Sequence, residues 1–444
     1  MLTQALFVDP VVARCFDDRA TLQAMLDFEA TLARAEAALG IIPATAVAPI
    51  VAAADADGFD VAEIARAAAG AGNVAIPLVK ALTARVAAHD PEAARYVHWG
   101  ATSQDAIDTG LVLQLREGVR HVIGVLAELD EALVSLSDRH VDTVMVARTW
   151  LQQATPTTFG RKAAGWLAAI RRTRSGLERA LREASVVQFG GASGTLAALG
   201  DRGLDVAERL ARELDLTLPA LPWHAERDRF AALAAACANV AGILGKIARD
   251  VSLLAQSEVA EAAEPSAPGR GGSSTMPQKR NPVACAVALA AAVRAPGLAA
   301  TMFAALAQEH ERGLGGWHAE WETLPELVRV VSGSAHMMAA AIAGLHVDAT
   351  RMRANLDATR GFAMAESFKT ALAASIGLGR AHDLVEEASR SATADGRSLR
   401  EALENDAVVR AHMSPEELDR AGDPDRYLGV AAEFVRRSIA EPAQ

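Results

Sequence analysis

Residues 273–281 read Ser-Ser-Thr-Met-Pro-Gln-Lys-Arg-Asn and place hydroxyl groups, two cations and an amide within nine positions. A hydroxyl can transfer a proton, and cations and amide N–H groups stabilise negative charge that develops during a reaction. The residues before them, from Glu264, are rich in proline and glycine, which excludes a helix or a strand. A loop this long between helical patterns is typical of a lid, a binding loop or a linker. The composition alone is that of a linker, whereas the chemistry of residues 273–281 favours a movable lid.

Polar side chains gather again in residues 98–109, which read His-Trp-Gly-Ala-Thr-Ser-Gln-Asp-Ala-Ile-Asp-Thr. Thr102 and Ser103 are residue types that cap helices, so a helix start is expected here, with unpaired backbone N–H groups beside free hydroxyls. That arrangement favours an anion, although capping alone also explains both residues. His98 has less support, because a single histidine is more often structural.

Residues 308–321 are dense in ionisable and aromatic groups, and His310, Glu311, His318 and Glu320 suggest a metal site. Their spacing is not His-Glu-x-x-His, and two glycines interrupt the helical pattern, so no metal is predicted. The glycine-rich residues 190–195 lack the lysine of a phosphate-binding loop and are predicted to be an ordinary turn. No cofactor is predicted.

The chain has 444 residues and a formal net charge of −11, with no block of like charges. Nucleic acid is therefore not an expected partner, and an anionic substrate would need a locally basic pocket. Three widely spaced cysteines without a CxxC pattern indicate reduced thiols in a cytoplasmic protein: Cys15, Cys237 and Cys285. Residues 1–10 do not resemble a signal peptide, and the most apolar run, 283–293, is too short to span a bilayer. No membrane is expected as a partner.

The elements that must position these groups are helices, because alanine-rich composition and scarce strand-like alternation predict an all-α protein. Helical patterns cover residues 18–39, 61–82 with a break at 70–77, 107–141, 159–181, 205–214, 230–263, 283–308 with a kink at Pro296, and 317–344. The pattern over 107–141 is long enough for a bundle helix, whose opposite face is expected to meet another subunit. Ser414-Pro-Glu-Glu417 predicts a capped helix start.

The run Gly272–Pro282 resembles the signature loop of the fumarase/aspartase superfamily. Residues 98–109 are similar to the first conserved region of its adenylosuccinate lyase branch, and residues 147–156 to the second. The resemblance covers nearly the whole chain. It implies an all-α fold of three helical domains, 1–104, a central long-helix bundle at 105–346 containing the loop 264–282, and 347–444. It also implies a homotetramer in which three subunits build each active site.

The resemblance further implies roles for individual residues. Ser273 would be the proton-transfer group, and Lys279 and Asn281 would stabilise developing negative charge. The residues implied in substrate binding are His98, Thr102, Ser103, Gln104, Arg148, Thr149, Trp150, Gln152, Ser274, Met276 and Arg312.

Two positions depart from the superfamily pattern. Trp150 stands where most members have a histidine, and Ala286 stands where they have its glutamate partner. An amine or hydroxide leaving group needs a general acid, which contributes about two to four orders of magnitude in rate. A carboxylate, whose pKa is about 4, leaves without one and attacks without a base. The superfamily reaction with this property is lactonisation of 3-carboxy-cis,cis-muconate, in the protocatechuate branch of the β-ketoadipate pathway.

We therefore expect an intramolecular lyase, a cycloisomerase, that acts on a small anionic tricarboxylate and uses Trp150 as an apolar wall. The first alternative is an adenylosuccinate lyase-like β-elimination that releases fumarate, and Trp150 and Ala286 count against it. The second is a non-catalytic helical scaffold, against which the intact loop counts.

Overall fold

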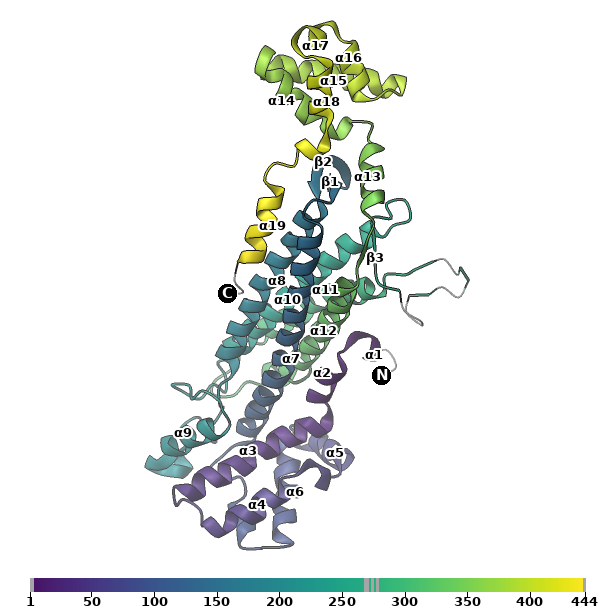
Figure 1. Ribbon diagram of the computed structural model, residues 1–444. Coiled ribbons are helices and arrows are strands. Elements are labelled where there is room, and N and C mark those ends of the chain that lie inside the picture. The colour runs from purple at the N-terminus through teal and green to yellow at the C-terminus, as the bar shows by residue number, and fades with distance from the viewer. Residues whose placement is uncertain (1–3, 267–270, 273–274, 277–278, 442–444) are drawn as a thin grey trace. The chain divides into compact units, whose positions relative to one another are not determined.

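The computed structural model describes residues 4–266, 271–272, 275–276 and 279–441, and helices dominate it (Figure 1). The strands among these residues form two short antiparallel pairs. The predicted all-α class is therefore confirmed. The chain forms two compact units: the first comprises Met1–Leu126, Thr173–Gly245 and Val287–His336, and the second Ala127–Arg172, Lys246–Ala286 and Met337–Gln444. The predicted three-domain division remains a prediction.

The first unit begins with six helices: α1 Gln4–Phe7, α2 Pro10–Cys15, α3 Asp18–Ala38, α4 Val47–Ala53, α5 Val61–Ala71 and α6 Ala75–Ala87. The break predicted within the second helical region is shorter than expected. Helix α5 ends at Ala71 and is capped by Gly72, whose φ of 80° is left-handed and favours glycine. Helix α6 starts before Pro77, because a proline in a first turn leaves no intrahelical hydrogen bond unmade.

The long helix predicted over residues 107–141 is α7, Ser103–Arg139, and the boundary between the units divides it after Leu126. Its buried positions are mainly apolar. Its exposed positions include Glu117, Arg120, Glu128, Glu131 and Asp138. The opposite face of α7 is thus charged, and its expected contact with another subunit remains a prediction.

The α-helices that follow α7 along the chain are α8 Phe159–Ala184, α9 Gly203–Glu213, α10 Asp228–Leu254, α11 Val283–Ala304 and α12 Gly316–Ala343. Helix α10 ends at Leu254, and the prediction that it reaches Ala263 is wrong. Ala260 adopts a left-handed φ of 52°, which turns the chain so that the N–H of Glu261 donates to the Leu254 carbonyl. Ala262–Ala263 (β3) then pairs with His346–Val347 (β4). Helix α11 passes through Pro296 and ends before the predicted Gln308.

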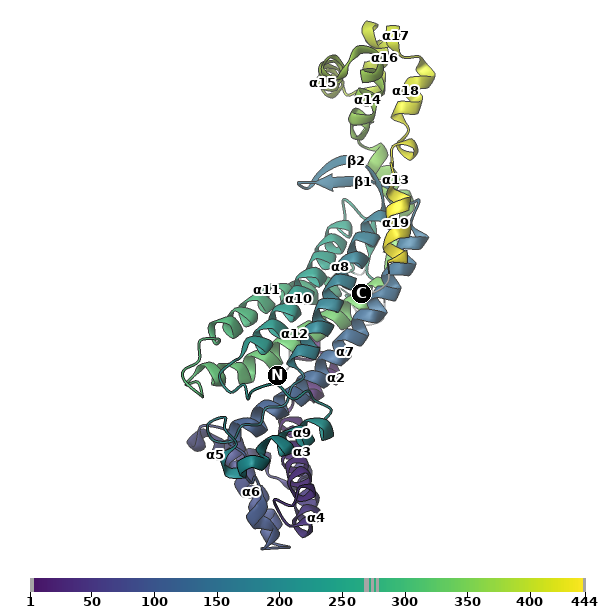
Figure 2. The same cartoon turned by 90° about the vertical axis from the view of Figure 1, so that its left-hand side faces the viewer.

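Helices α10 and α11 are long and apolar enough to cross a membrane by length and composition. The core helix of a soluble protein meets the same criterion. Helix α11 extends well beyond the apolar run predicted at 283–293, and it keeps apolar side chains exposed, with Val293 81% and Phe303 50% exposed. It lies at the edge of the helical bundle beside α10 (Figure 2). Helix α11 thus carries an exposed apolar face.

The second unit contains a hairpin that we did not predict, β1 Val144–Thr149 with β2 Gln152–Thr158. Its short strands carry little alternation, and its turn lacks glycine or asparagine, the usual hairpin signal. The helices after α12 are α13 Ala349–Asp357, α14 Ala365–Ile376, α15 Leu378–Asp395, α16 Leu399–Asn405, α17 Ala407–His412, α18 Pro415–Gly422 and α19 Ala431–Ala440. The capped start predicted at Ser414 is confirmed, with both bonds of the capping box formed.

Candidate active site

The first turn of α7 is anchored by Asp105, whose side chain is fully buried. Its carboxylate accepts backbone N–H bonds from Thr102 at 3.0 Å, Gly190 at 3.0 Å and Gly191 at 2.9 Å. It also pairs with Nε2 of His224 at 2.8 Å. The turn predicted at residues 190–195 is therefore confirmed, and the N–H groups of Gly190 and Gly191 hold the first turn of α7 through Asp105.

A second buried carboxylate, Asp108, lies one turn further along α7. It accepts from Nη1 of Arg227 at 2.7 Å and from Nε1 of Trp317 at 2.9 Å. Arg227 also donates to Glu320, from Nη2 at 2.6 Å, and both partners are buried. Burial raises the pKa of Glu320, although Arg227 opposes that shift. We call Asp108, Arg227 and Glu320 the buried ion cluster.

Gln104 and Arg312, both predicted to bind substrate, are brought together beside this cluster. Nε of Arg312 donates to Oε1 of Gln104 at 2.8 Å, and Nη2 donates to the carbonyl of Ala192 at 3.3 Å. Gln104 is fully buried, whereas Arg312 is partly exposed. Of the two, only Arg312 can reach a ligand in this conformation.

His98, Thr102 and Ser103 are partly exposed in the same unit. Nδ1 of His98 lies 2.6 Å from Oε1 of the buried Glu29, and the backbone φ of His98 is 60°. Burial lowers the pKa of His98, but Glu29 and Asp105 outweigh it and raise the pKa overall. The protonated form of His98 is thus favoured more than in a free histidine. The hydroxyl of Ser103 accepts from Asn73 at 3.5 Å.

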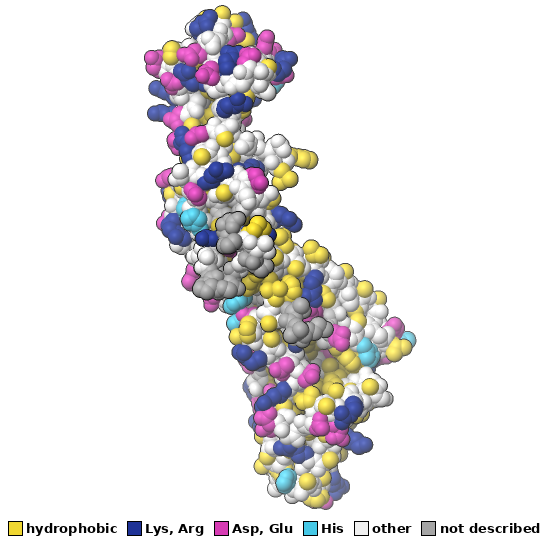
Figure 3. All heavy atoms as spheres, turned by 90° about the vertical axis from the view of Figure 1, so that its right-hand side faces the viewer, with side chains coloured by type: hydrophobic (Ala, Val, Ile, Leu, Met, Phe, Trp, Pro, Cys, Tyr) yellow, Lys and Arg dark blue, Asp and Glu magenta, His cyan; other side chains and the backbone are white. Residues whose placement is uncertain are grey.

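In the second unit, the hairpin carries four of the predicted residues. Arg148 forms a bidentate ion pair with the buried Glu261, at 2.8 and 2.7 Å. Thr149, Trp150 and Gln152 are exposed, and Trp150 is 94% exposed. Figure 3 shows hydrophobic side chains at the end of this projecting hairpin.

The signature loop borders a cavity of about 620 Å³ in the second unit, lined by Met276, Lys279, Arg280 and Asn281 among others. Lys279 and Arg280 are exposed, and the N–H of Asn281 donates to the Gly271 carbonyl at 2.8 Å. Ser273 and Ser274 lie outside the described residues.

The position expected for the relay glutamate, Ala286, is exposed in the first turn of α11. An acid does lie nearby, since Glu264 accepts from the N–H groups of Ala284 at 3.1 Å and Cys285 at 2.8 Å. These bonds occupy Glu264 as a cap of the α11 N-terminus.

Sequence reasoning assigned no role to Glu29, Asp105, Asp108, Arg227 or Glu320. The usable signal was the pair Asp105 and Asp108, acids three residues apart and so on one face at the start of the long helical pattern. Buried carboxylates require partners, so the pair predicts buried donors. Which donors they find depends on segments far away in sequence.

Comparison with known proteins identifies the family of the chain. Residues 8–297 match the family described as Lyase, and residues 361–438 match Adenylosuccinate lyase C-terminus. The chain is 57% identical to 3-carboxy-cis,cis-muconate cycloisomerase of Bradyrhizobium diazoefficiens, over 95% of this chain and 94% of that one. It is 55% identical to the Pseudomonas aeruginosa protein of the same name, over 99% and 96%.

Solved structures give the same result. The crystal structure of 3-carboxy-cis,cis-muconate lactonizing enzyme from Pseudomonas putida matches with a TM-score of 0.94 and 51% identity, covering 99% of this chain and 98% of that chain. Fumarate lyase from Mesorhizobium sp. BNC1 matches with a TM-score of 0.90 and 39% identity, covering 98% and 99%. The chain therefore belongs to the lyase family of the fumarase/aspartase superfamily, whose signature loop it carries at residues 272–282.

Proposed function

We propose that this protein is an enzyme that converts 3-carboxy-cis,cis-muconate to carboxymuconolactone. Three relatives that are 53–57% identical are named 3-carboxy-cis,cis-muconate cycloisomerase. The observation that carries the proposal is the pair Trp150 and Ala286, which removes the histidine–glutamate relay. An ionised carboxylate attacks its own double bond without a base, so the reaction needs one proton transfer. Adenylosuccinate lyase-like elimination, which needs an acid for its leaving group, is not favoured.

The proposed roles follow the chemistry of each group. Ser273 transfers the proton, while Lys279 and Asn281 stabilise the charge that spreads into the substrate carboxylate. Ser274 and Met276 belong to the same lid, while Thr149, Trp150 and Gln152 form a wall from the hairpin. Thr102, Ser103, cationic His98 and Arg312 hold carboxylates. Arg148 supports the hairpin, because Glu261 already neutralises its charge.

We propose that the enzyme is a cytoplasmic homotetramer in which three subunits complete each active site. Trp150 and Leu151 are 94% and 76% exposed with left-handed φ values of 54° and 65°. Such backbone costs on the order of 1–3 kcal/mol per residue and persists where its surroundings favour it. A covering subunit would bury both side chains, and the exposed face of α11 offers a second apolar contact surface.

The direct test is to mix purified protein with 3-carboxy-cis,cis-muconate and follow loss of the diene's ultraviolet absorbance together with lactone formation. Adenylosuccinate is the comparison substrate, and nitrosuccinate is a second one, because a 43% identical relative is named nitrosuccinate lyase. Nitrite also departs without a general acid. Turnover of either comparison substrate in place of the muconate would replace the proposal, and inactivity towards all three would favour the scaffold.

The proposed carboxylate contact from His98 predicts a pH dependence. Its pKa is raised above the ordinary 6.5, so the cation persists to higher pH than in a free histidine and is lost as pH rises through the raised value. We expect KM to increase over that alkaline range in the wild type and to stay flat in His98→Gln. If His98 were instead the proton-transfer group, the same variant would lose kcat with little change in KM.

A further inference from the structure

The side-chain amide of Gln104 is fully committed within the first unit. Its Nε2 donates to Oδ2 of Asp108 at 3.0 Å and to the carbonyl of His224 at 2.8 Å. Its Oε1 accepts from Nε of Arg312 at 2.8 Å. With no exposed surface, this amide has both N–H groups used and no approach open to a substrate.

These partners permit one orientation of the amide. Reversing it would place Oε1 against the Asp108 carboxylate and the His224 carbonyl, which are both acceptors. It would also turn Nε2 towards the N–H of Arg312, a donor facing a donor. Asp108 cannot move to relieve this conflict, because Arg227 and Trp317 hold both of its oxygens.

The loop that carries Arg312 is tied to the buried ion cluster by a second contact. Nε2 of Gln308 donates to Oε1 of Glu320 at 2.9 Å. Next to Arg312, an added Cβ at Gly313 would lie 2.5 Å from Oε1 of Gln308, so the loop packs closely there. Two glutamines therefore connect one buried cluster to the Arg312 loop.

We propose that Gln104 is a positioning residue that orients Arg312 towards a carboxylate of the bound ligand, and that it does not itself contact the ligand. A neutral amide orients the guanidinium without cancelling its charge, in contrast to the Glu261 carboxylate that pairs with Arg148. In Arg312, Nε and one N–H of Nη2 already donate hydrogen bonds, whereas Nη1 has no partner among the described residues. This inference rests on the proposed function, because it names the group that Arg312 binds there.

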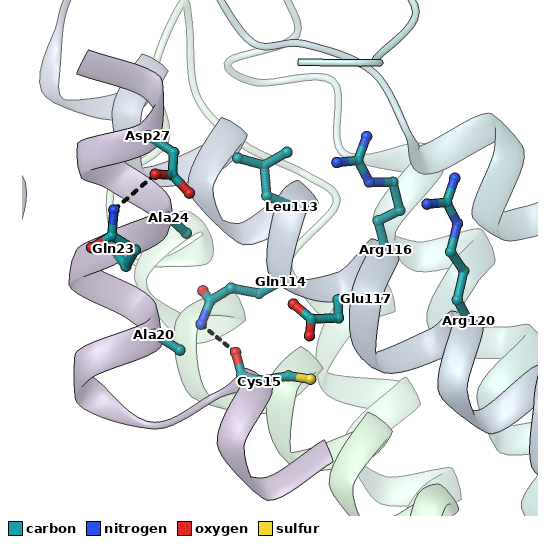
Figure 4. A pocket seen from close by; sticks show the side chains of 10 residues that line it. All are labelled: Cys15, Ala20, Gln23, Ala24, Asp27, Leu113, Gln114, Arg116, Glu117 and Arg120. Atoms are coloured by element: carbon teal, nitrogen blue, oxygen red, sulfur yellow. Dashed lines mark hydrogen bonds between the residues drawn. The ribbon is translucent and has the colours of Figure 1, made fainter. Parts of the chain in front are cut away.

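The test compares Gln104→Met with Gln114→Met, a matched loss of a buried amide on the same helix. Gln114 donates to the Cys15 carbonyl at 2.8 Å (Figure 4) and to the Thr21 hydroxyl at 3.0 Å, and neither bond involves Arg312 or its partners. A hydrogen bond to a charged group corresponds to about ten- to a hundredfold in affinity. We expect KM, and the Kd of the unreactive tricarboxylate tricarballylate in calorimetry, to rise by about that factor in Gln104→Met. In Gln114→Met both should stay at the wild-type value.

Arg312→Lys keeps the charge but removes the Nε–H that Gln104 accepts. We expect it to raise KM and Kd like Gln104→Met, and the double variant to bind no worse than Arg312→Lys alone. The inference would be overturned if either single variant bound tricarballylate with wild-type affinity. It would also be overturned if the affinity losses of the two changes multiplied in the double variant, or if Gln114→Met lost as much affinity as Gln104→Met. If Gln104→Met does not fold, Arg312→Lys decides. Wild-type protein that binds tricarballylate without converting the muconate would count against the proposed function only.

Discussion

The start of α7 and the tip of the β1–β2 hairpin both carry predicted substrate-binding residues, yet they are built in opposite ways. At the start of α7, Asp105 and Asp108 are buried and each accepts several hydrogen bonds within one unit. At the hairpin tip, Trp150 and Leu151 are exposed on a left-handed backbone. The first region is organised by its own unit, whereas the second presents apolar surface that the proposed assembly would cover. One part of the proposed site is thus preformed within a single chain, and the other would be completed only in the proposed tetramer.

The largest effect should come from neither region but from the loop. Ser273→Ala is expected to lower kcat by about two to four orders of magnitude, since it removes the proposed proton-transfer group. The assay is lactone formation at saturating substrate. Ser257→Ala is the matched control, because Ser257 is exposed and lines the cavity beside the loop. Equal loss in both variants would mean that the loop responds to any change at this cavity.

The preformed region can be broken at Arg227. Arg227→Met leaves Asp108 and Glu320 buried without their cation, and removing one partner of a buried pair costs about 3–5 kcal/mol. Chemical denaturation should show that loss in the free energy of unfolding. Arg353→Met, which breaks exposed pairs with Asp357 and Asp425, should cost at most about 1 kcal/mol. Similar losses in both variants would contradict the contrast between the cluster and the surface.

The first unit also contains a buried carboxyl group that, unlike Asp108 and Glu320, has no cation beside it in the described part of the chain. Glu36 is fully buried, neither oxygen has a hydrogen-bond partner among the described residues, and burial together with Glu29 raises its pKa to about 9. The folded protein keeps this proton while the unfolded chain releases it above pH 4.5, so stability is lost as pH rises between these values.

Glu36→Gln removes that loss and should gain on the order of 3 kcal/mol of stability at pH 7 relative to wild type. The gain should vanish below pH 4.5, where wild-type Glu36 is protonated in both states. Thermal unfolding of both proteins from pH 4 to pH 9 measures it. A difference that does not change with pH would show that Glu36 titrates normally.

The smallest effect is expected at the hairpin tip. Trp150→Phe keeps an apolar ring and should lower kcat/KM by about tenfold at most, the lower end of the range for one missing methylene in an apolar pocket. Trp150→His restores only one member of the missing relay, so it should not introduce turnover of adenylosuccinate. A larger loss in Trp150→Phe than in Ser273→Ala would reverse the proposed roles of wall and proton-transfer group.

Much of the architecture was predictable from the chain. The bounds of α3, α7, α8 and the end of α12 agree with the helical patterns, because long apolar periodicities outweigh local ambiguity. The end of α10 was not predictable, since it depends on the left-handed Ala260 and on pairing with residues 346–347. The hairpin was missed because Trp150 and Leu151 are unusual residues for its turn.

The sequence by itself determined the reaction class. The residues at positions 150 and 286 and in the loop decide which proton-transfer groups the protein has. It also determined where the long helices lie, since periodicity is a local property. Only the tertiary structure decided that Asp108 meets Arg227, that Glu29 raises the pKa of His98, and that the Gln104 amide faces Arg312. Buried polar groups choose partners by proximity in the folded unit, and those partners lie tens to hundreds of residues away in the chain.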